Sequence, residues 1–361
     1  MSRIASLTTT VVDVPLARPI TTAIHAIESA GCVLVDVATT DGAVGQGYVF
    51  AINGRRIRAF DEVLRDFADL VVGRDVADAA GIWQTIWDDL NPTGHAGITV
   101  SALSAVDVAV WDAHARELDV PLHSLFGTCR NRIDTYASSG LWLSASLDDL
   151  AAEARRFMDA GFRAVKVRIG SSDVTDDVAR VRAVRAAVGP EVAIHTDANQ
   201  GLTIDHAIAL SRALADLDVA WLEEPVAYDD LPGHARVRSE GGIPVATGET
   251  VFAAAGIAAI LDAGACDVVM PDLQRVGGYT EMSRACALAS SAGVPVSTHF
   301  FTEHSLTVAA STPGCLSVEH VDWFAPLFVE QLELVDGQLV IPDRPGTGFT
   351  FDEAARTRYR V

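Results

Sequence analysis

The sequence predicts an α/β protein in which a (β/α)8-type barrel carries an α+β capping domain formed by the N-terminal segment and the C-terminal tail. Residues 1–127 show strand alternation and then helical periodicity, residues 128–321 alternate short apolar strands with helical stretches, and residues 322–361 lose this alternation. We therefore expect a capping domain over the first range and the barrel with the active site over the second. The third range should be a tail that packs on the capping domain.

The N-terminal segment begins as a small antiparallel sheet and continues as helices. Strand-like alternation covers residues 7–14, 31–39 and 44–49. The glycines Gly42, Gly45 and Gly47 lie in this hairpin and open no helix, so we interpret them as a turn rather than a phosphate-binding loop. Helical periodicity then covers residues 57–72, 76–90 and 99–118, with Ser101 as the expected cap of the last helix.

Beyond Gly127 the sequence changes to short apolar strands separated by helical stretches of about 10–15 residues. Strands joined by helices in this way are typical of parallel sheets, and eight such units indicate a closed barrel. The expected strands are Ile133–Ser138, Ala164–Ile169, Val192–Asp197, Ala220–Glu224, Pro244–Gly248, Asp267–Pro271, Val294–His299 and Leu316–Val321.

Composition indicates a globular protein and excludes several partners. The 361 residues are 49% hydrophobic, yet no apolar run approaches the ~18 residues of a membrane span and no signal-peptide core opens the chain. The formal net charge of −21 opposes binding to nucleic acid and to anionic membrane surfaces. Five cysteines without a CxxC motif indicate reduced thiols. We therefore expect a cytoplasmic protein whose partner is a small molecule.

The chain contains a single lysine, Lys166, while every other fixed positive charge is an arginine. An arginine is in effect never neutral, whereas a lysine in a desolvated site can lose its proton and act as a base. Lys166 lies in the alternating strand pattern of residues 164–169, which aims Lys166 and Arg168 in the same direction. The alternative is an ordinary surviving surface lysine.

Charged or polar residues close successive predicted strands of the barrel. In this fold the active site is assembled at the carboxyl ends of the strands, so these side chains should converge. Singly, each has an ordinary structural explanation, such as a helix cap or a satisfied core histidine, but their joint occurrence favours a site. In strand order they are Lys166 and Arg168, Asp197 and Asn199, Glu223 and Glu224, Glu249, Asp272, His299 and Glu319.

Three of these residues, Asp197, Glu223 and Glu249, come from adjacent strands and offer hard carboxylate oxygens. Such ligands suit Mg²⁺, with Mn²⁺ as the alternative, and they leave coordination positions for water and substrate. The absence of nearby cysteine or paired histidine in the sequence argues against zinc. We therefore expect an open, catalytic magnesium site.

At these residues the sequence resembles the enolase superfamily, and within it the mandelate racemase group, over essentially the whole chain. The resemblance extends to the helix pattern at residues 105–112 and to the barrel entry at residues 121–127. The matching motifs are Lys166-Val167-Arg168, Asp197-Ala198-Asn199, Glu223-Glu224-Pro225, Gly248-Glu249, Met270-Pro271-Asp272, Gly277-Gly278, His299 and Glu319.

The resemblance implies that Mg²⁺ on the three carboxylates binds a substrate carboxylate, and that the enzyme abstracts the α-proton to give an enediolate. It implies that Asp272 bonds to His299 and raises its basicity, which makes His299 a base on one face of the substrate. Glu319, if protonated, would donate to the enediolate. The family is usually oligomeric, so a homo-oligomer is expected on this ground alone.

Substrate-binding residues are predicted around this centre. Ser138, at the end of the first barrel strand, resembles a substrate-binding serine of the family, and Arg168 and Asn199 are further candidates. The loop after Pro19 resembles the loop that closes over the substrate in the family. Ile24 and His25 in this loop are therefore expected to contact the distal end of the substrate.

The sequence departs from the family pattern at Arg168, where the common Lys-x-Lys motif has its second lysine. Arginine does not readily release a proton, so racemisation with two bases would require Lys166 to take over. A one-base dehydration of an acid sugar, an aldonate or aldarate, to a 2-keto-3-deoxy acid fits better. Enzymes of the superfamily that carry lysine near position 272, such as lactonising enzymes and dipeptide epimerases, are set aside because Asp272 stands there.

Two alternatives remain open at this point. The isoleucines of the loop after Pro19 suit an apolar 2-hydroxy acid, so a racemase or epimerase of the mandelate racemase type is the second hypothesis. The third is a catalytically silent metal-binding paralogue. The three differ in whether the substrate loses water, exchanges its α-proton or does neither.

Overall fold

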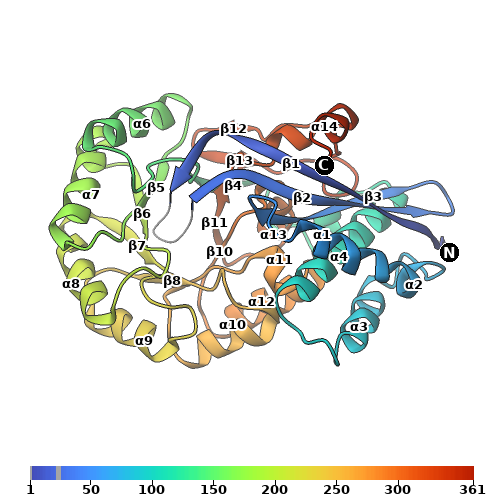
Figure 1. Ribbon diagram of the computed structural model, residues 1–361. Coiled ribbons are helices and arrows are strands. Elements are labelled where there is room, and N and C mark those ends of the chain that lie inside the picture. Colours follow the sequence, from blue (N-terminus) through green and yellow to red (C-terminus); the bar gives the residue numbers. More distant parts are fainter. Residues whose placement is uncertain (1, 22–25) are drawn as a thin grey trace.

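The computed structural model of the protein describes residues 2–21 and 26–361 (Figure 1). The N-terminal part is an antiparallel sheet in which β2 lies between β1 and β3. Its strands are β1 (Ile4–Thr21), β2 (Ala26–Thr39) and β3 (Val44–Ile52).

Alternation along β2 buries both faces of this sheet. Val33, Val35 and Val37 pack in a core with the neighbouring helices, whereas Cys32 and Leu34 belong to a core shared with the barrel. Because successive strand residues point to opposite faces, two apolar sets are needed where a sheet is covered on both sides. The sheet is therefore a middle layer between its own helices and the barrel.

The helices α1 (Ile57–Asp66), α2 (Ala68–Val71) and α4 (Ile98–Glu117) contact the outer face of this sheet, and α3 (Ala79–Asp89) packs against α4. The single helix expected over residues 57–72 is wrong, because the chain breaks at Phe67 into α1 and α2. Gly97, and not Ser101, precedes α4, and Ser101 is buried within this helix.

Two glycines of β3 serve close packing, which corrects the prediction of a turn. A Cβ atom at Gly45 would collide with the backbone of α4 at Ala109, and one at Gly47 would collide with it at Ala105. Glycine allows the two backbones to approach. Of the three glycines, Gly42 alone lies in the turn, with φ +96°.

Eight parallel strands close into a barrel, which confirms the predicted fold class. Neighbours follow chain order, and the last strand pairs with the first. Each strand lies within two residues of its expected bounds: β4 (Arg132–Ala137), β5 (Ala164–Arg168), β6 (Ala193–Asp197), β7 (Val219–Glu223), β8 (Val245–Thr247), β9 (Val268–Val269), β10 (Val296–Thr298) and β11 (Cys315–His320).

Helices surround the barrel in Figure 1 and connect its strands. They are α6 (Leu147–Asp159), α7 (Val174–Val188), α8 (Ile204–Leu214) with the 3-10 turn η1 (Ala215–Leu217), α9 (Leu231–Glu240), α10 (Ala253–Asp262), α11 (Leu273–Val276), α12 (Tyr279–Ser291) and α13 (Thr302–Ser311). The short helix α5 (Leu122–Phe126) leads from the cap into the first barrel strand.

The tail contacts both the barrel and the N-terminal sheet. It contains η2 (Ala325–Leu327), β12 (Leu334–Val335), β13 (Gln338–Val340) and α14 (Glu353–Arg358). Strand β13 pairs antiparallel with β4 of the barrel. Arg356 of α14 makes a two-pronged ion pair with Asp36 of β2, at 2.5 and 2.6 Å. The domain boundaries expected from the sequence stay a prediction.

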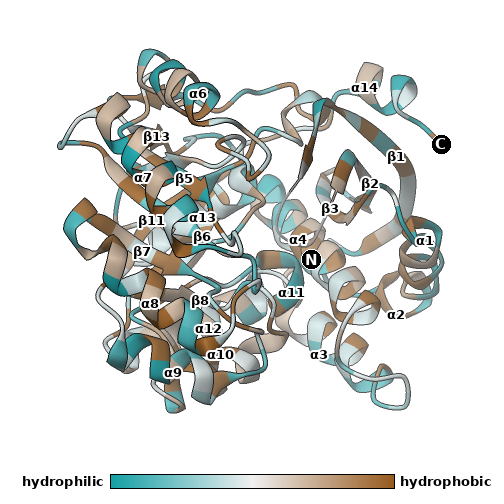
Figure 2. Ribbon diagram, turned by 60° about the vertical axis from the view of Figure 1, so that its left-hand side comes forward, coloured by the Kyte–Doolittle hydropathy of each residue, from teal (hydrophilic) through white to brown (hydrophobic). Residues whose placement is uncertain are grey.

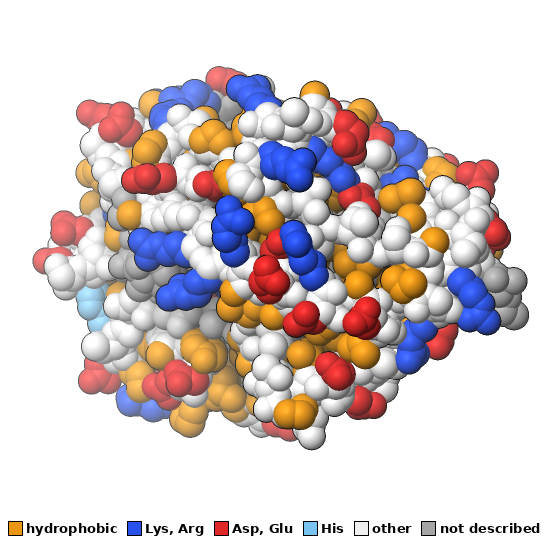
Figure 3. All heavy atoms as spheres, turned by 45° about the vertical axis from the view of Figure 1, so that its right-hand side comes forward, with side chains coloured by type: hydrophobic (Ala, Val, Ile, Leu, Met, Phe, Trp, Pro, Cys, Tyr) orange, Lys and Arg blue, Asp and Glu red, His pale blue; other side chains and the backbone are white. Residues whose placement is uncertain are grey.

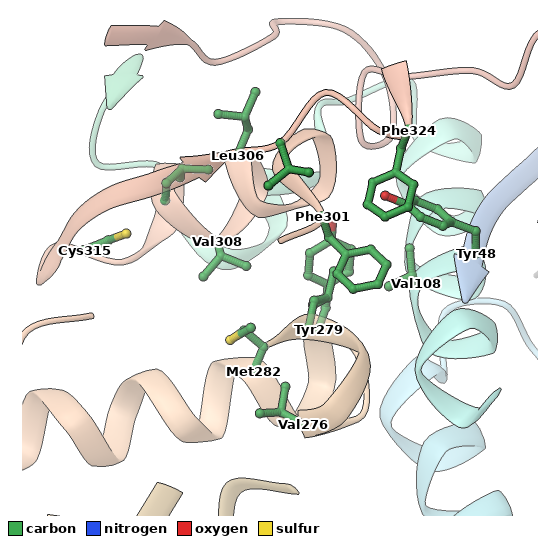
Figure 4. Packing of buried hydrophobic residues seen from close by; sticks show 14 of the residues in the cluster. Tyr48, Val108, Val276, Tyr279, Met282, Phe301, Leu306, Val308, Cys315 and Phe324 are labelled. Carbon is green, nitrogen blue, oxygen red and sulfur yellow. The ribbon is translucent and has the colours of Figure 1, made fainter. Parts of the chain in front are cut away.

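An aromatic core joins the cap to the barrel (Figure 4). Tyr48 of β3 lies against Phe301 and Phe324, with ring centroids 5.0 and 5.1 Å apart. Both phenylalanines follow barrel strands, β10 and β11 respectively. This core therefore fixes the cap directly behind the carboxyl ends of those strands.

The distribution of apolar and charged residues is shown in Figures 2 and 3. Brown, apolar segments follow the barrel strands in Figure 2, and on the face shown in Figure 3 acidic and basic side chains are interspersed. None of the described helices is long and apolar enough to cross a membrane. All five cysteines are free thiols, as predicted.

Candidate active site

Three acidic side chains meet at the carboxyl ends of β6, β7 and β8. Asp197 ends β6, Glu223 ends β7, and Glu249 follows β8 by two residues. Each offers one carboxylate oxygen, and these oxygens lie within 4.8 Å of one another. Asp197 and Glu223 are fully buried and the Glu249 side chain is 12% exposed. A buried set of three hard anionic oxygens fits a magnesium ion.

The chain turns sharply where these strands end. Asn199, Gln200 and Glu224 adopt positive φ values of 42°, 63° and 36°, and Phe300 and Phe301 after β10 adopt 49° and 47°. Side chains other than glycine rarely occupy this region, and such residues cluster at functional sites. The backbone strain thus coincides with the predicted site.

Lys166 lies at the centre of the carboxylates. Its Nζ is 2.6 Å from Glu319 Oε1, 2.8 Å from Glu223 Oε1 and 3.5 Å from Asp197 Oδ2. The side chain is fully buried, which excludes the alternative of a surface lysine. All three of these polar partners are carboxylates, and Lys166 is not among the residues that line the open cavity.

Arg168, two residues further along β5, points the same way as Lys166 and is bonded to the same centre. Its Nη1 bonds to Asp197, and its Nη2 donates to Ser138 Oγ at 3.0 Å. The guanidinium lies over the Trp142 ring, 4.9 Å from the centroid, while its buried Nε has no partner within the protein. Ser138 in turn donates to Glu319 Oε1 at 2.5 Å. Ser138 thus lies at the site and links Arg168 to Glu319.

His299 and Asp272 form a dyad after β10 and β9. His299 Nδ1 lies 2.7 Å from Asp272 Oδ2, and Asp272 Oδ1 accepts a bond of 2.8 Å from the backbone N–H of Arg275. The other ring nitrogen, Nε2, lies 3.3 Å from Glu249 Oε2. Burial by itself lowers the pKa of His299, but the charge of Glu249 and the bond to Asp272 outweigh it and raise the pKa to about 8. The expected contact between Asp272 and His299 is therefore present.

Glu319 is held as a carboxylate rather than a carboxylic acid. Burial raises its pKa, but Lys166, His299 and Arg168 outweigh this effect and hold the pKa well below its usual range. Its Oε2 accepts the backbone N–H of Phe300 at 2.9 Å. The lowered pKa favours the carboxylate form of Glu319, whereas a role as hydrogen-bond donor to the enediolate would need the protonated form.

A fourth carboxylate, Glu224, lies beside the triad. Its Oε2 accepts from Gln200 Nε2 at 2.5 Å and from Thr250 Oγ1 at 3.4 Å, whereas Oε1 has no partner in the described part of the chain. Burial, with the charge of Glu249, raises the pKa of Glu224 to about 8. The Oδ1 of Asn199 also has no partner. This edge of the site therefore carries unused acceptors.

Several of these charged and polar residues line a cavity of about 270 Å³, namely Arg168, Asn199, Glu224, Glu249, Asp272 and His299. Another part of the lining is apolar, and we call it the aromatic wall. The residues that form it come from the cap and from the loops after β4, β10 and β11, namely Ile27, Phe50, Ile52, Trp142, Phe300 and Trp323. Phe300 stacks on Phe50 with centroids 5.8 Å apart, and its edge contacts Trp323 at 5.1 Å. The lining is thus charged in one part and apolar in another.

Gln274 anchors the cap residue Phe50 to the barrel. Its side-chain carbonyl accepts the Phe50 N–H at 2.7 Å, and its amide donates to the Phe50 carbonyl at 3.3 Å. Gln274 lies in α11, the helix whose cap is Asp272. The wall and the dyad are therefore held by one short helix.

Sequence reasoning anticipated Ile27 of the aromatic wall, as one of the isoleucines of the loop after Pro19, but it missed the aromatic residues of the wall and Gln274. Trp142 and Trp323 follow barrel strands closely, so the strand-end rule that selected the charged residues could have found them. Phe50 comes from a hairpin far away in the sequence, and nothing in its local pattern predicts its place. The predicted lid residues Ile24 and His25 lie outside the described part of the chain.

Comparison with known proteins identifies the family. The model described as "Mandelate racemase / muconate lactonizing enzyme, N-terminal domain" matches residues 5–127, and the one described as "Enolase C-terminal domain-like" matches residues 149–355. The chain belongs to the enolase superfamily. Among curated proteins, 3,6-anhydro-alpha-L-galactonate cycloisomerase of Streptomyces coelicolor is 34% identical to this chain, and the match covers 94% of both chains.

Comparison with solved structures supports the same family. An enolase from alpha pretobacterium bal199 with bound magnesium has a TM-score of 0.96 and 35% identity over 100% of both chains. L-Talarate dehydratase from Polaromonas sp. JS666, complexed with magnesium and L-glucarate, has a TM-score of 0.95 and 30% identity over 100% of this chain and 98% of its own. This superfamily member is accordingly an enzyme of the lyase or isomerase class, and its cofactor is magnesium.

Proposed function

We propose that the enzyme dehydrates an acid sugar to a 2-keto-3-deoxy acid, with His299 as its single base. The observation that carries the proposal is the makeup of the cavity wall. His299 lines the cavity, Arg168 lines it where the family motif has a second lysine, and Lys166 is enclosed by carboxylates. A two-base racemisation needs a second proton acceptor facing the substrate, whereas a dehydration needs one.

The steps follow from the position of His299. Its Nε2 removes the proton from the carbon next to the substrate carboxylate, and Asp272 holds the ring by Nδ1 and stabilises the imidazolium. The imidazolium then gives this proton to the β-hydroxyl as the C–O bond breaks, so water leaves and His299 returns to its starting form. The resulting enol takes a proton from water at the β-carbon and releases its hydroxyl proton to water, which gives the 2-keto-3-deoxy acid.

The cations of the site, including the metal held by its carboxylates, stabilise the negative charge that develops on the enediolate. Magnesium held by Asp197, Glu223 and Glu249 supplies the positive charge that makes the α-proton acidic. Lys166 and Arg168 add two fixed positive charges on the same side. We propose that Glu319 holds Lys166 in position. Glu319 then affects the substrate carboxylate only indirectly, through Lys166.

The unused acceptors favour a polyhydroxylated substrate. Asn199 Oδ1 and Glu224 Oε1 have no partner among the described residues, and a buried acceptor without a partner is costly. The hydroxyl groups of a sugar acid would supply the missing donors. The relatives support the same class, because they include a cycloisomerase and a dehydratase named for sugar acids.

The aromatic wall favours a second candidate, a racemase of an apolar 2-hydroxy acid. Phe50, Phe300 and Trp323 would suit an aryl group at the distal end of such a substrate. Arg168 weighs against it as the second base. A homo-oligomer and a cytoplasmic location remain predictions.

Proton NMR in D₂O separates these functions. The purified enzyme with Mg²⁺ is tested against a panel of aldonic acids, aldaric acids and aromatic 2-hydroxy acids. A 2-keto-3-deoxy product supports the dehydratase and identifies the sugar. Deuterium at the α-carbon with loss of stereochemistry and no loss of water would contradict it and favour the racemase, and no exchange with any acid would favour a silent paralogue.

A further inference from the structure

We infer that the enzyme selects acid sugars with one carboxylate, so that its substrate is an aldonate and not an aldarate. This inference rests on the proposed function and specifies its substrate class. An aldonate and the aldarate of the same configuration differ at the distal carbon, which is a hydroxymethyl group in one and a carboxylate in the other. The selection therefore depends on what the cavity offers to the distal end of the substrate.

The positive charges of the cavity lie at its metal-binding end. Among the described residues that line the cavity, the permanently charged cations are Arg168 and Arg275, and His299 beside Glu249 is the titratable one. Arg168 is bonded to Asp197 and Ser138. Arg275 Nη1 donates to the backbone carbonyl of Glu249 at 2.6 Å and lies 3.9 Å from the Glu249 carboxylate. Both arginines are thus anchored next to metal ligands, where the reacting carboxylate of the substrate belongs.

The aromatic wall forms another part of the lining. Arg168 lies over its Trp142, but among the described residues no lysine or arginine lies over Phe50, Phe300 or Trp323. Phe50 and Phe300 stack on each other and Trp323 packs against both, with centroids 6.0 and 5.1 Å away. Ile27 and Ile52 complete the wall from the cap. A carboxylate placed here would lose its water without gaining a charged partner. A carbon chain that ends in a hydroxymethyl group would place its C–H bonds on the rings, and its desolvation would cost less free energy than that of a carboxylate.

The wall is also too firmly built to move aside for a second charge. Gln274 holds the Phe50 backbone through both its N–H and its carbonyl. Phe300 donates its N–H to the buried Glu319, and its ring contacts His299 at 4.5 Å. Displacing Phe300 would disturb Glu319 and His299, and displacing the Phe50 backbone would break both of its bonds to Gln274. Because its residues are held in place, the wall excludes a charged group at the distal end of the substrate.

The test measures kcat/KM with Mg²⁺ for aldonate and aldarate pairs of matched configuration, by proton NMR in D₂O. We expect kcat/KM for the aldonate to exceed that for its aldarate by at least about tenfold, because an unpaired buried charge is penalised. The variant Ile52→Lys places a cation in the wall, and Ile52→Met is the matched uncharged control. Ile52→Lys should shift the ratio toward the aldarate by about tenfold, and Ile52→Met should leave it unchanged.

Three results would overturn the inference. Equal or higher kcat/KM for aldarates in the wild type would do so while leaving the proposed dehydration intact. An unchanged ratio in Ile52→Lys would show that the wall does not discriminate. The absence of α-proton exchange with every acid of the panel would remove the proposed function and this inference together.

Discussion

The two sides of the cavity differ in how the chain builds them. On the charged side, Asp197, Glu223 and Glu249 are placed by consecutive barrel strands, each at or just after the strand end. On the other side, Phe50 comes from the cap while Trp142 and Trp323 come from loops after the first and last barrel strands. The charged side is thus a local consequence of the barrel, whereas the aromatic wall needs the whole fold. Chemistry and substrate choice are therefore separable by mutation.

The largest effect is expected on the charged side, from His299→Asn. Asparagine keeps a polar group near Asp272 but accepts no proton, so α-proton exchange should fall by at least about a thousandfold. Exchange is measured by NMR and Mg²⁺ binding by calorimetry, and the latter should persist. His123→Asn, in the short helix α5 away from the site, is the control. Near-normal exchange in His299→Asn would disprove the role of His299 as the base.

Arg168→Lys sharpens the comparison because it restores the family's Lys-x-Lys pattern. Lysine cannot bond to Asp197 and Ser138 in the same geometry as the guanidinium, so turnover should fall by about tenfold to a hundredfold. The new amine could also exchange the α-proton of the opposite stereoisomer. Incorporation of α-deuterium into each stereoisomer measures this exchange. If Arg168→Lys kept wild-type turnover and exchanged no proton of the opposite stereoisomer, the argument from Arg168 would be contradicted.

This charged side is also the part that the sequence could predict. The strand-end rule selected Lys166, Asp272 and His299 because a barrel brings the carboxyl ends of its strands together. It could not give the charge state of Glu319. This depends on Lys166, which comes from a different strand and whose Nζ lies 2.6 Å from Glu319 Oε1. Nor could it place Phe50, whose contact with Gln274 joins residues 224 positions apart. Long-range contacts of this kind leave no periodic trace in the sequence.

A smaller effect is expected from Trp221→Phe, beneath the metal site. Trp221 Nε1 donates to Glu223 Oε2 at 3.2 Å, so its removal should lower Mg²⁺ affinity by about tenfold, because partners of metal ligands orient them. Calorimetry measures the affinity, and saturating Mg²⁺ should restore most of the activity. Trp87→Phe, in the cap, is the matched control. Equal affinities in the two variants would show that this bond does not orient Glu223.

The smallest effect is expected on the wall itself, from Phe50→Leu. Loss of the stacked ring on Phe300 should raise KM by about threefold to tenfold while kcat changes little, because aromatic contacts of this type are individually modest. Steady-state kinetics measure both constants, and Mg²⁺ affinity should be unchanged. A drop in kcat as large as that of His299→Asn would mean that the two sides of the cavity are not separable.

The pairing of β4 with both β11 and β13 also bears on how the protein is made. Gln338 of β13 bonds to Asp134 of β4 across 204 positions of the chain. At roughly 5–20 residues per second on the ribosome, the first barrel strand waits about 10 to 40 s for these partners. During that time its edge is open to other chains, which is a hazard for aggregation. The nascent barrel is therefore a natural client for a chaperone until its last strands emerge.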